Sequence, residues 1–390
     1  MLKLGEKIIN KLYLGDKKIA KVFLGDKLVY QSQKITFLDY IIFDGASWID
    51  TGIKPVFGDE LEITAQIGEA VAGQNYVLFG TGTSSIQFTG LIESGRVFNR
   101  YFGTKAGTSV GHDTTTTSHT YLFKNDGSVY QNGKLITSPF TVTEATVNSN
   151  LTIGTRGYVT EYWLGNIYSV KLISANGTVK LDLRPCIHPN GTVCFYDLVT
   201  NKYFYNQGTG ELKAGGRFVK SILFDGASYI DTGITHQTCT VECDIRFEET
   251  GTRQLMGFGT GTGQFWGAGA TGIFDYMSGT NALDRTLVVI NFDATEKTVT
   301  INADGKTRTG SKGSSLSSHS YKIGTAPTGA TGGLYWCTCE VWGNKFTNAD
   351  GELIQDLRPY VDADGKAYFK DLVTGDLFYG QGTGTLGYTE

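Results

Sequence analysis

Two segments of the chain alternate between apolar and polar residues with the two-residue period of a β-strand. The first runs from Glu60 to Ile67 (ELEITAQI) and the second from Thr240 to Phe247 (TVECDIRF). One face of each segment is apolar and the other polar, as a half-buried strand of a two-layered sandwich requires. Runs of helical period extend to about two turns at most. The pattern therefore predicts an all-β protein.

Turn-forming pairs separate the predicted strands. The segment from Tyr121 to Leu135 contains Asp126-Gly127 and Asn132-Gly133 between short apolar runs, and such pairs favour tight turns. The composition agrees, with 52 Gly, 22 Phe and 21 Tyr but 18% charged residues. Phe, Tyr, Thr and Val are the residue types that favour strands.

A long motif occurs twice and indicates a duplicated domain. FDGASWIDTGI at Phe43–Ile53 recurs as FDGASYIDTGI at Phe224–Ile234. The shorter motifs FGTGT, IGT, DLRP and DLVT follow in the same order in both copies. A chain of 390 residues exceeds what one core usually serves, whereas two copies of about 175 residues are ordinary domain sizes. We expect sandwiches at residues 35–213 and 217–390, with a hinge at 214–217.

Residues 1–34 hold a different, shorter repeat. LGEK and LGDK motifs begin at Leu4, Leu14 and Leu24, ten residues apart, with strand-like segments between them. Thirty residues cannot bury enough apolar surface to fold alone. We therefore expect an anchor and oligomerisation segment whose core is completed by other copies or by a docking partner, although packing onto its own first sandwich stays open. The expected contact residues are Leu4, Ile8, Leu14, Ile19, Leu24 and Leu28.

Charge and hydropathy argue against several classes of partner. The net charge is −4 and the basic residues are scattered, so we expect no nucleic-acid binding, which needs a row of cations. No apolar run approaches the roughly 20 residues that span a bilayer, so we expect no membrane insertion. The start MLKLGE carries charges where a signal peptide is apolar. We expect synthesis in the cytoplasm without a recognisable export signal.

The six cysteines leave alternatives open. Cys186 and Cys194 flank a turn at Pro189-Asn190-Gly191 and should lie opposite each other on a hairpin, where the second copy has Tyr360 and Tyr368. They are interpreted as packing partners. A disulfide is the alternative, and it is not the first choice because direct cross-strand geometry strains that bond. The other four are interpreted as buried strand residues. These four are Cys239, Cys243, Cys337 and Cys339. The alternative for them is a zinc site with four thiolate ligands, but their spacing is unusual for zinc. No metal is therefore predicted.

These motifs together resemble the concanavalin A-like lectin and glucanase superfamily in its laminin-G-like form. The resemblance lies in the FDGAS opening, the alternating strand with Glu62 or Glu242, the hairpin at Asn132-Gly133-Lys134, and the late strands at Tyr162-Trp163 and Tyr335-Trp336. It implies two tandem jelly-roll β-sandwiches preceded by the short N-terminal β-repeat segment.

A second resemblance concerns the setting. The ending DLRP…DLVT…FYNQGTGEL and the LGDK decamers are similar to segments of tailed-bacteriophage head-fibre, tail-fibre and baseplate proteins. This resemblance implies a virion protein with a glycan-binding, host-attachment role, released from the host cytoplasm by lysis. The implied partners are further copies of the chain in a trimer, a capsid or tail protein bound through residues 1–30, and a host surface polysaccharide. A decoration protein without ligand is the alternative.

A glycoside hydrolase is the second alternative. Glucanases of the superfamily place paired carboxylates on one strand face, and Glu242, Asp244 and Glu248 share such a face. However, the last spacing is one residue too long and Arg246 intervenes. We expect no enzyme and no catalytic residues.

The glycan-binding candidates are aromatic and arginine residues in segments that differ between the copies. Sugar sites stack aromatic rings on the sugar beside polar side chains. No cofactor is predicted; calcium, common among the relatives, stays open, but EF-hand spacing is absent. The candidates are Arg96, Tyr101, Arg156 and Tyr158 in the first copy and Trp266 and Tyr276 in the second.

Overall fold

The computed structural model confirms an all-β chain, since none of the described residues is helical. Among these residues, no helix is long and apolar enough to cross a bilayer. The structure describes all residues except 1–2, 5–6, 9–11, 15–16, 20, 25–26, 32–34, 69–74, 83–86, 94–95, 103, 108–116, 157–160, 236, 248–252, 259–264, 270–271, 274–284, 297, 304, 312–319, 329–332 and 337.

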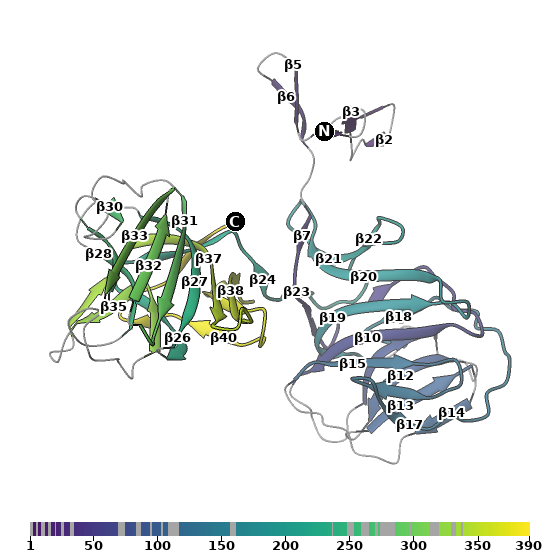
Figure 1. Cartoon of the computed structure of the whole chain (residues 1–390). Coiled ribbons are helices and arrows are strands. Elements are labelled where there is room, and N and C mark those ends of the chain that lie inside the picture. Colours follow the sequence, from purple (N-terminus) through teal and green to yellow (C-terminus); the bar gives the residue numbers. More distant parts are fainter. Residues whose placement is uncertain are drawn as a thin grey trace. The chain divides into compact units, whose positions relative to one another are not determined.

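The chain divides into two compact units, Met1–Gly215 and Gly216–Glu390, drawn in purple to teal and in teal to yellow in Figure 1. The division falls inside the hinge expected at residues 214–217. Only Gly215 and Gly216 separate the last strand of the first unit from the first strand of the second.

The first unit contains two antiparallel sheets. Strand β10 is central in the larger one, between β15 and β19, and the order is β17-β16-β15-β10-β19-β20-β21-β22, with β7 on β20 and β8 joining β19 and β23. The smaller sheet has the order β14-β13-β12-β11-β18-β9. The larger sheet comprises β7 (Thr36–Phe37), β8 (Ile41–Asp44), β10 (Glu60–Ile67), β15 (His119–Phe123), β16 (Val129–Gln131), β17 (Lys134–Thr137), β19 (Leu164–Ile173), β20 (Val179–Ile187), β21 (Val193–Asp197), β22 (Tyr203–Phe204) and β23 (Lys213–Ala214). The smaller comprises β9 (Ile49–Asp50), β11 (Asn75–Gly80), β12 (Phe88–Glu93), β13 (Arg96–Tyr101), β14 (Thr104–Gly107) and β18 (Thr152–Ile153).

The second unit repeats this topology. Its larger sheet has the order β33-β32-β31-β27-β37-β38-β39-β40, with β24 on β38 and β25 joining β37 and β42, and its smaller sheet the order β30-β29-β28-β34-β26-β41. The larger sheet comprises β24 (Arg217–Phe218), β25 (Ser221–Asp225), β27 (Cys239–Phe247), β31 (Thr286–Asp293), β32 (Thr298–Ala303), β33 (Lys306–Ser311), β37 (Thr338–Asn348), β38 (Leu353–Val361), β39 (Ala367–Asp371), β40 (Leu377–Tyr379) and β42 (Gly387–Thr389). The smaller comprises β26 (Ser228–Thr235), β28 (Arg253–Phe258), β29 (Phe265–Gly269), β30 (Gly272–Ile273), β34 (Ser320–Ile323) and β41 (Gln381–Gly382), and β35 (Thr325–Thr328) pairs with β36 (Gly333–Trp336).

Each unit is a sandwich because its core contains side chains from both sheets. In the first, Phe123 of the larger sheet meets Phe79 of the smaller with ring centroids 4.8 Å apart. In the second, Phe346 and Tyr321 meet in the same way at 4.7 Å. Strand β10 alternates between half-buried and buried residues along its whole length, so the period-two prediction is confirmed.

The N-terminal repeat forms three two-stranded hairpins, described here by their backbone. The strands are β1 (Lys3–Leu4), β2 (Lys7–Ile8), β3 (Leu12–Leu14), β4 (Lys17–Ile19), β5 (Lys21–Leu24) and β6 (Lys27–Gln31). The paired residues that flank the three Gly-acidic pairs of the sequence are Leu4 with Lys7, Leu14 with Lys17 and Leu24 with Lys27. The described parts pair within their own hairpins and not with a sandwich sheet. The side chains of the six predicted contact residues lie outside the description, so their role stays a prediction.

Candidate functional site

The repeated FDGAS motif closes a turn and also holds the C-terminal part of its own sandwich. Asp44 accepts hydrogen bonds from the backbone N–H of Ala46 at 2.9 Å and from the hydroxyl of Ser47 at 2.7 Å. Its second oxygen accepts from the backbone N–H of Glu211 at 2.7 Å. Burial by itself would raise the pKa of Asp44, but these hydrogen bonds outweigh it and hold the pKa below its ordinary value.

The second copy has the same arrangement. Asp225 accepts from the backbone N–H of Ala227 and the hydroxyl of Ser228, each at 2.9 Å. Its other oxygen accepts from the backbone N–H of Thr385 at 2.6 Å. A glycine is required beside this carboxylate, because a Cβ on Gly384 would lie 2.2 Å from Asp225. The FDGAS and QGTG motifs therefore recur together because each contacts the other.

The carboxylate of Asp197 is fully buried and organises the DLVT turn that follows β21. One oxygen accepts from the backbone N–H groups of Asp182 at 2.9 Å and Val199 at 3.1 Å. The other accepts from the backbone N–H of Thr200 at 3.0 Å and from its hydroxyl at 2.5 Å. In the second copy, Asp371 accepts three corresponding hydrogen bonds.

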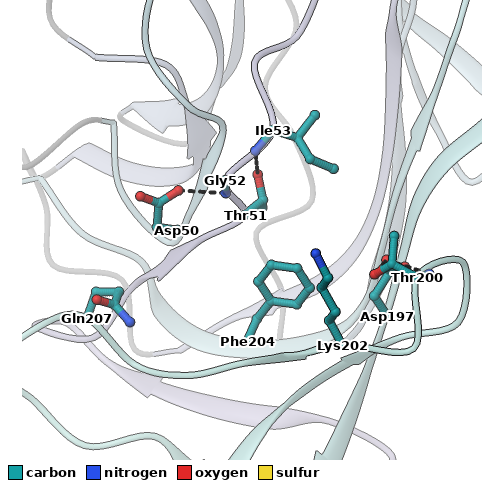
Figure 2. A pocket seen from close by; sticks show the side chains of 9 residues that line it. All are labelled: Asp50, Thr51, Gly52, Ile53, Asp197, Thr200, Lys202, Phe204 and Gln207. Atoms are coloured by element: carbon teal, nitrogen blue, oxygen red, sulfur yellow. Dashed lines mark hydrogen bonds between the residues drawn. The ribbon is translucent and has the colours of Figure 1, made fainter. Parts of the chain in front are cut away.

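A pocket of about 460 Å³ lies in the first sandwich between the DTGI segment after β9 and the segment that follows Asp197 (Figure 2). The DTGI segment is fixed from within: Asp50 accepts from the backbone N–H of Gly52 at 2.8 Å, and the hydroxyl of Thr51 donates to the carbonyl of Leu151 at 2.8 Å. The pocket is lined by Asp50, Thr51, Gly52, Ile53, Asp197, Thr200, Lys202, Phe204 and Gln207.

Two of the lining side chains, Lys202 and Phe204, come from alternate positions of one extended segment. Figure 2 shows both pointing from this segment toward Thr51 and Ile53, with Asp50 and Gln207 on the opposite side of the ring from Lys202. Lys202 is exposed and Phe204 half-buried. The pocket thus offers an ammonium group and part of an aromatic face, with a carboxylate and an amide at its other side.

The corresponding segments of the second sandwich are identical at eight of the nine lining positions, and the exception is Lys202, whose place is taken by Asp376. The surroundings of the aspartate also differ, because Asp231, the counterpart of Asp50, accepts from the Lys322 ammonium at 2.5 Å. Burial would raise the pKa of Asp231, but Lys322 and the Ser320 hydroxyl outweigh burial and lower it. The two copies therefore share a scaffold at this place and differ in its charge.

The six residues predicted to bind glycan do not gather at this pocket. Tyr101 is fully buried, and its hydroxyl donates to the carbonyl of Asp59 at 3.0 Å and accepts from the N–H of Gly58 at 2.9 Å. Burial raises the pKa of Tyr101. A ring without an exposed face cannot stack on a sugar, so the predicted role of Tyr101 is corrected to core packing.

Arg156 forms an ion pair with Glu161 at 2.5 Å and does not line the pocket. The side chains of Arg96 and Trp266, and the whole of Tyr158 and Tyr276, lie outside the described residues. The sequence analysis did not select Lys202 or Phe204. The reversal of charge between Lys202 and Asp376, at the one lining position that differs between the copies, was a signal that could have found them.

One carboxylate of the row that suggested a hydrolase, Asp244, is held in an ion pair, and so is Arg246, which interrupts the row. Asp244 accepts two hydrogen bonds from Nε of Arg285 at 2.9 and 3.1 Å, and Arg246 lies 2.6 Å from Glu340. Within the part of the chain that the structure covers, no group of three or more His, Cys, Asp or Glu side chains is placed to hold a metal ion. Cys239, Cys243 and Cys339 are buried in the core of the second sandwich.

Comparison with solved structures gives neighbours that include two laminin regions. The mouse laminin α1 chain, domains LG4-5, is 10% identical with a TM-score of 0.30, and the match covers 82% of this chain and 91% of that one. The LG1-3 region of the laminin α2 chain is 10% identical with a TM-score of 0.28, covering 91% of this chain and 70% of that one. No family model and no curated protein matches. Scores this low place no residue of this chain on those structures.

Proposed function

We propose that the protein is a carbohydrate-binding attachment protein and that the pocket of the first sandwich contacts the glycan. The observation that carries the proposal is the pairing of Phe204 with Lys202 in one pocket, with Asp50 and Gln207 across from them (Figure 2). Sugar sites combine an aromatic face for C–H contacts with a few fixed donors and acceptors. The pocket volume, about 460 Å³, suits the end of a glycan chain.

Each lining side chain has a distinct part in this proposal. Phe204 packs against the apolar face of a sugar ring, and the Lys202 ammonium donates to hydroxyl or carboxylate oxygens of the ligand. Asp50 is held rigidly by Gly52 and by Asn150, whose amide donates to it at 3.1 Å. A carboxylate fixed in this way positions an acceptor without a further entropy loss on binding.

The proposed setting is the virion of a tailed bacteriophage. The sequence resemblance of the LGDK decamers and of the DLRP…QGTG ending supports it, as does an N-terminal segment whose described strands pair only within their own hairpins. In this proposal residues 1–30 join a trimer to a capsid or tail protein. The sandwiches then bind host surface polysaccharide after lysis releases the particle, and no catalysis is included.

A decoration protein without ligand is the second candidate. This candidate is favoured because Asp44 and Asp197, which belong to repeated motifs, use their carboxylates to accept hydrogen bonds from their own sandwich. Under this candidate the repeated motifs serve folding alone.

A glycan array probed with the full-length protein separates the two candidates. We expect binding to at least one bacterial surface glycan, and about tenfold weaker binding after Phe204→Ala, since loss of an aromatic contact is worth roughly 1 kcal/mol or more. Phe378→Ala, the matched change in the second sandwich, is the control and should leave that binding unchanged. If no glycan binds, the attachment function is refuted and the decoration role remains.

A further inference from the structure

One row of side chains crosses the outer strands of the larger sheet at the same place in both sandwiches. In the second, Phe218, Tyr360, Tyr368 and Tyr379 are successive cross-strand partners on β24, β38, β39 and β40. Their ring centroids lie 5.2, 5.3 and 4.9 Å apart in that order. Neighbouring rings of this row therefore contact one another across all four strands.

In the first sandwich two cysteines replace the two central rings. Phe37 pairs with Cys186, and Cys186 pairs with Cys194, on β7, β20 and β21. Both thiols are fully buried, and their sulfur atoms lie 3.6 Å apart. The expected position of the two residues opposite each other is thus confirmed.

The thiols lie in a small cluster of their own. Cys186 and Cys194 pack with Tyr196 and, at the edge of the cluster, with Ile35 and Tyr203. Phe195, which lies between Cys194 and Tyr196 in sequence, belongs to the main core. The pair therefore lies on the sheet face that points away from the main core.

The two thiols are not equivalent. Either sulfur can donate in the hydrogen bond between Cys186 and Cys194. This bond lowers the pKa of Cys194 against the opposing effect of burial, and the backbone N–H of His188 adds to the lowering. The same hydrogen bond, together with burial, raises the pKa of Cys186. The thiolate is the reactive form, so a lowered pKa favours Cys194 as the attacking thiol.

We propose that Cys186 and Cys194 form an oxidation site that closes to a cross-strand disulfide when the protein meets a small-molecule disulfide such as oxidised glutathione. A local opening of the covering residues first exposes the thiol, because Cys194 is fully buried. The Cys194 thiolate then attacks one sulfur of glutathione disulfide, so that a mixed disulfide forms and one glutathione thiolate leaves. Cys186 then loses its proton to solvent and attacks the Cys194 sulfur, which releases the second glutathione. The protein gives up two hydrogen atoms and the oxidant gains them.

The cross-strand position of Cys186 and Cys194 permits this closure. A disulfide needs sulfur atoms about 2.0 Å apart and Cα atoms about 4.4–6.8 Å apart, and directly paired antiparallel residues meet the second condition at about 4.5–5.5 Å. The sulfur atoms therefore approach by rotation about the side-chain bonds, while β20 and β21 keep their pairing. The bond would fix β21, which leads directly into Asp197 and the segment of Lys202 and Phe204. The formation of this disulfide does not depend on the proposed glycan binding.

Oxidation of the reduced full-length protein tests the inference. After incubation with oxidised glutathione under native conditions, the protein is denatured and its remaining thiols are alkylated. Of the six cysteines, four should accept the label, and the peptide holding Cys186 and Cys194 should be lighter by two hydrogen atoms. Six labelled cysteines, or a disulfide between other positions, would overturn the proposal.

The second sandwich supplies the control variant. The double substitution Cys186→Tyr, Cys194→Tyr copies Tyr360 and Tyr368, and it should leave four labelled cysteines with and without oxidant. Single variants test the order of attack: Cys186→Ser should trap glutathione on Cys194 at least about tenfold faster than Cys194→Ser traps it on Cys186. Equal trapping rates would refute the assignment of the nucleophile.

Discussion

The change of Asp197 to alanine tests whether the DLVT motif stabilises each sandwich from within. Asp197 is fully buried and accepts four hydrogen bonds, three of them from backbone N–H groups. Alanine leaves those three N–H groups without their acceptor, which costs about 1 kcal/mol of stability for each group. It also removes the hydrogen bond that the Thr200 hydroxyl donates to Asp197. The expected loss in the free energy of unfolding is about 4 kcal/mol.

The size of the unit converts this loss into a temperature shift. For domains of about 150–250 residues, 1 kcal/mol corresponds to about 2–4 °C in Tm, so Asp197→Ala should lower one melting transition by roughly 8–16 °C. Differential scanning calorimetry of the full chain measures it. Asp371→Ala is the matched change, and it should lower the transition of the other unit.

Two results would contradict the reasoning. A shift below about 2 °C for both variants would mean that water or neighbouring groups replace the carboxylate at little cost. A shift of the same transition by both variants would mean that the two units do not unfold separately.

Three further outcomes are expected. Lys202→Asp, which copies Asp376, should weaken binding of carboxylate-bearing glycans about tenfold more than binding of neutral ones in the same array; equal weakening would deny that Lys202 sets the charge preference. The pKa values of Asp44 and Asp225 are lowered in the folded state, so the unfolded state takes up protons first as the pH falls. The two carboxylates therefore stabilise the fold fully above the unfolded pKa of about 3.9. This stabilisation is lost as the pH falls through their pKa values in the folded state. Acid unfolding followed by circular dichroism should therefore be less steep for Asp44→Asn, and an unchanged acid slope would count against this linkage. Deletion of residues 1–30 should leave both sandwiches folded and abolish oligomerisation in sedimentation velocity; a truncated protein that keeps the full-length assembly state would refute the anchor.

The fold was predictable because its signals are local. The alternation in Glu60–Ile67 reports which side chains face the core, and the strand that forms there lies at the centre of the larger sheet. The turn between Cys186 and Cys194 fixes the hairpin register, and the two residues do pair directly. In both cases neighbouring residues carry all the necessary information.

The site was harder to predict because its signals are distant in sequence. The pocket joins Asp50–Ile53 to residues 197–207, and no local pattern brings these segments together. Tyr101 was misassigned because its residue type was considered without its strand face. Val97, Asn99 and Tyr101 alternate inward along β13 and are all buried, so the apolar Val97 already indicated the direction of the ring.

The duplication itself separates the needs of the fold from other needs. Both sandwiches keep the buried aspartate of the DLVT turn and the aspartate of the FDGAS turn, and both use them for the same hydrogen bonds. One scaffold accepts either Lys202 or Asp376 beside the pocket, and either a cysteine pair or a tyrosine pair in the cross-strand row. A position at which the same fold tolerates opposite charges or different chemistry is not specified by packing. The chemistry particular to each sandwich must therefore be sought at these positions: ligand charge at Lys202, and thiol oxidation at Cys186 and Cys194.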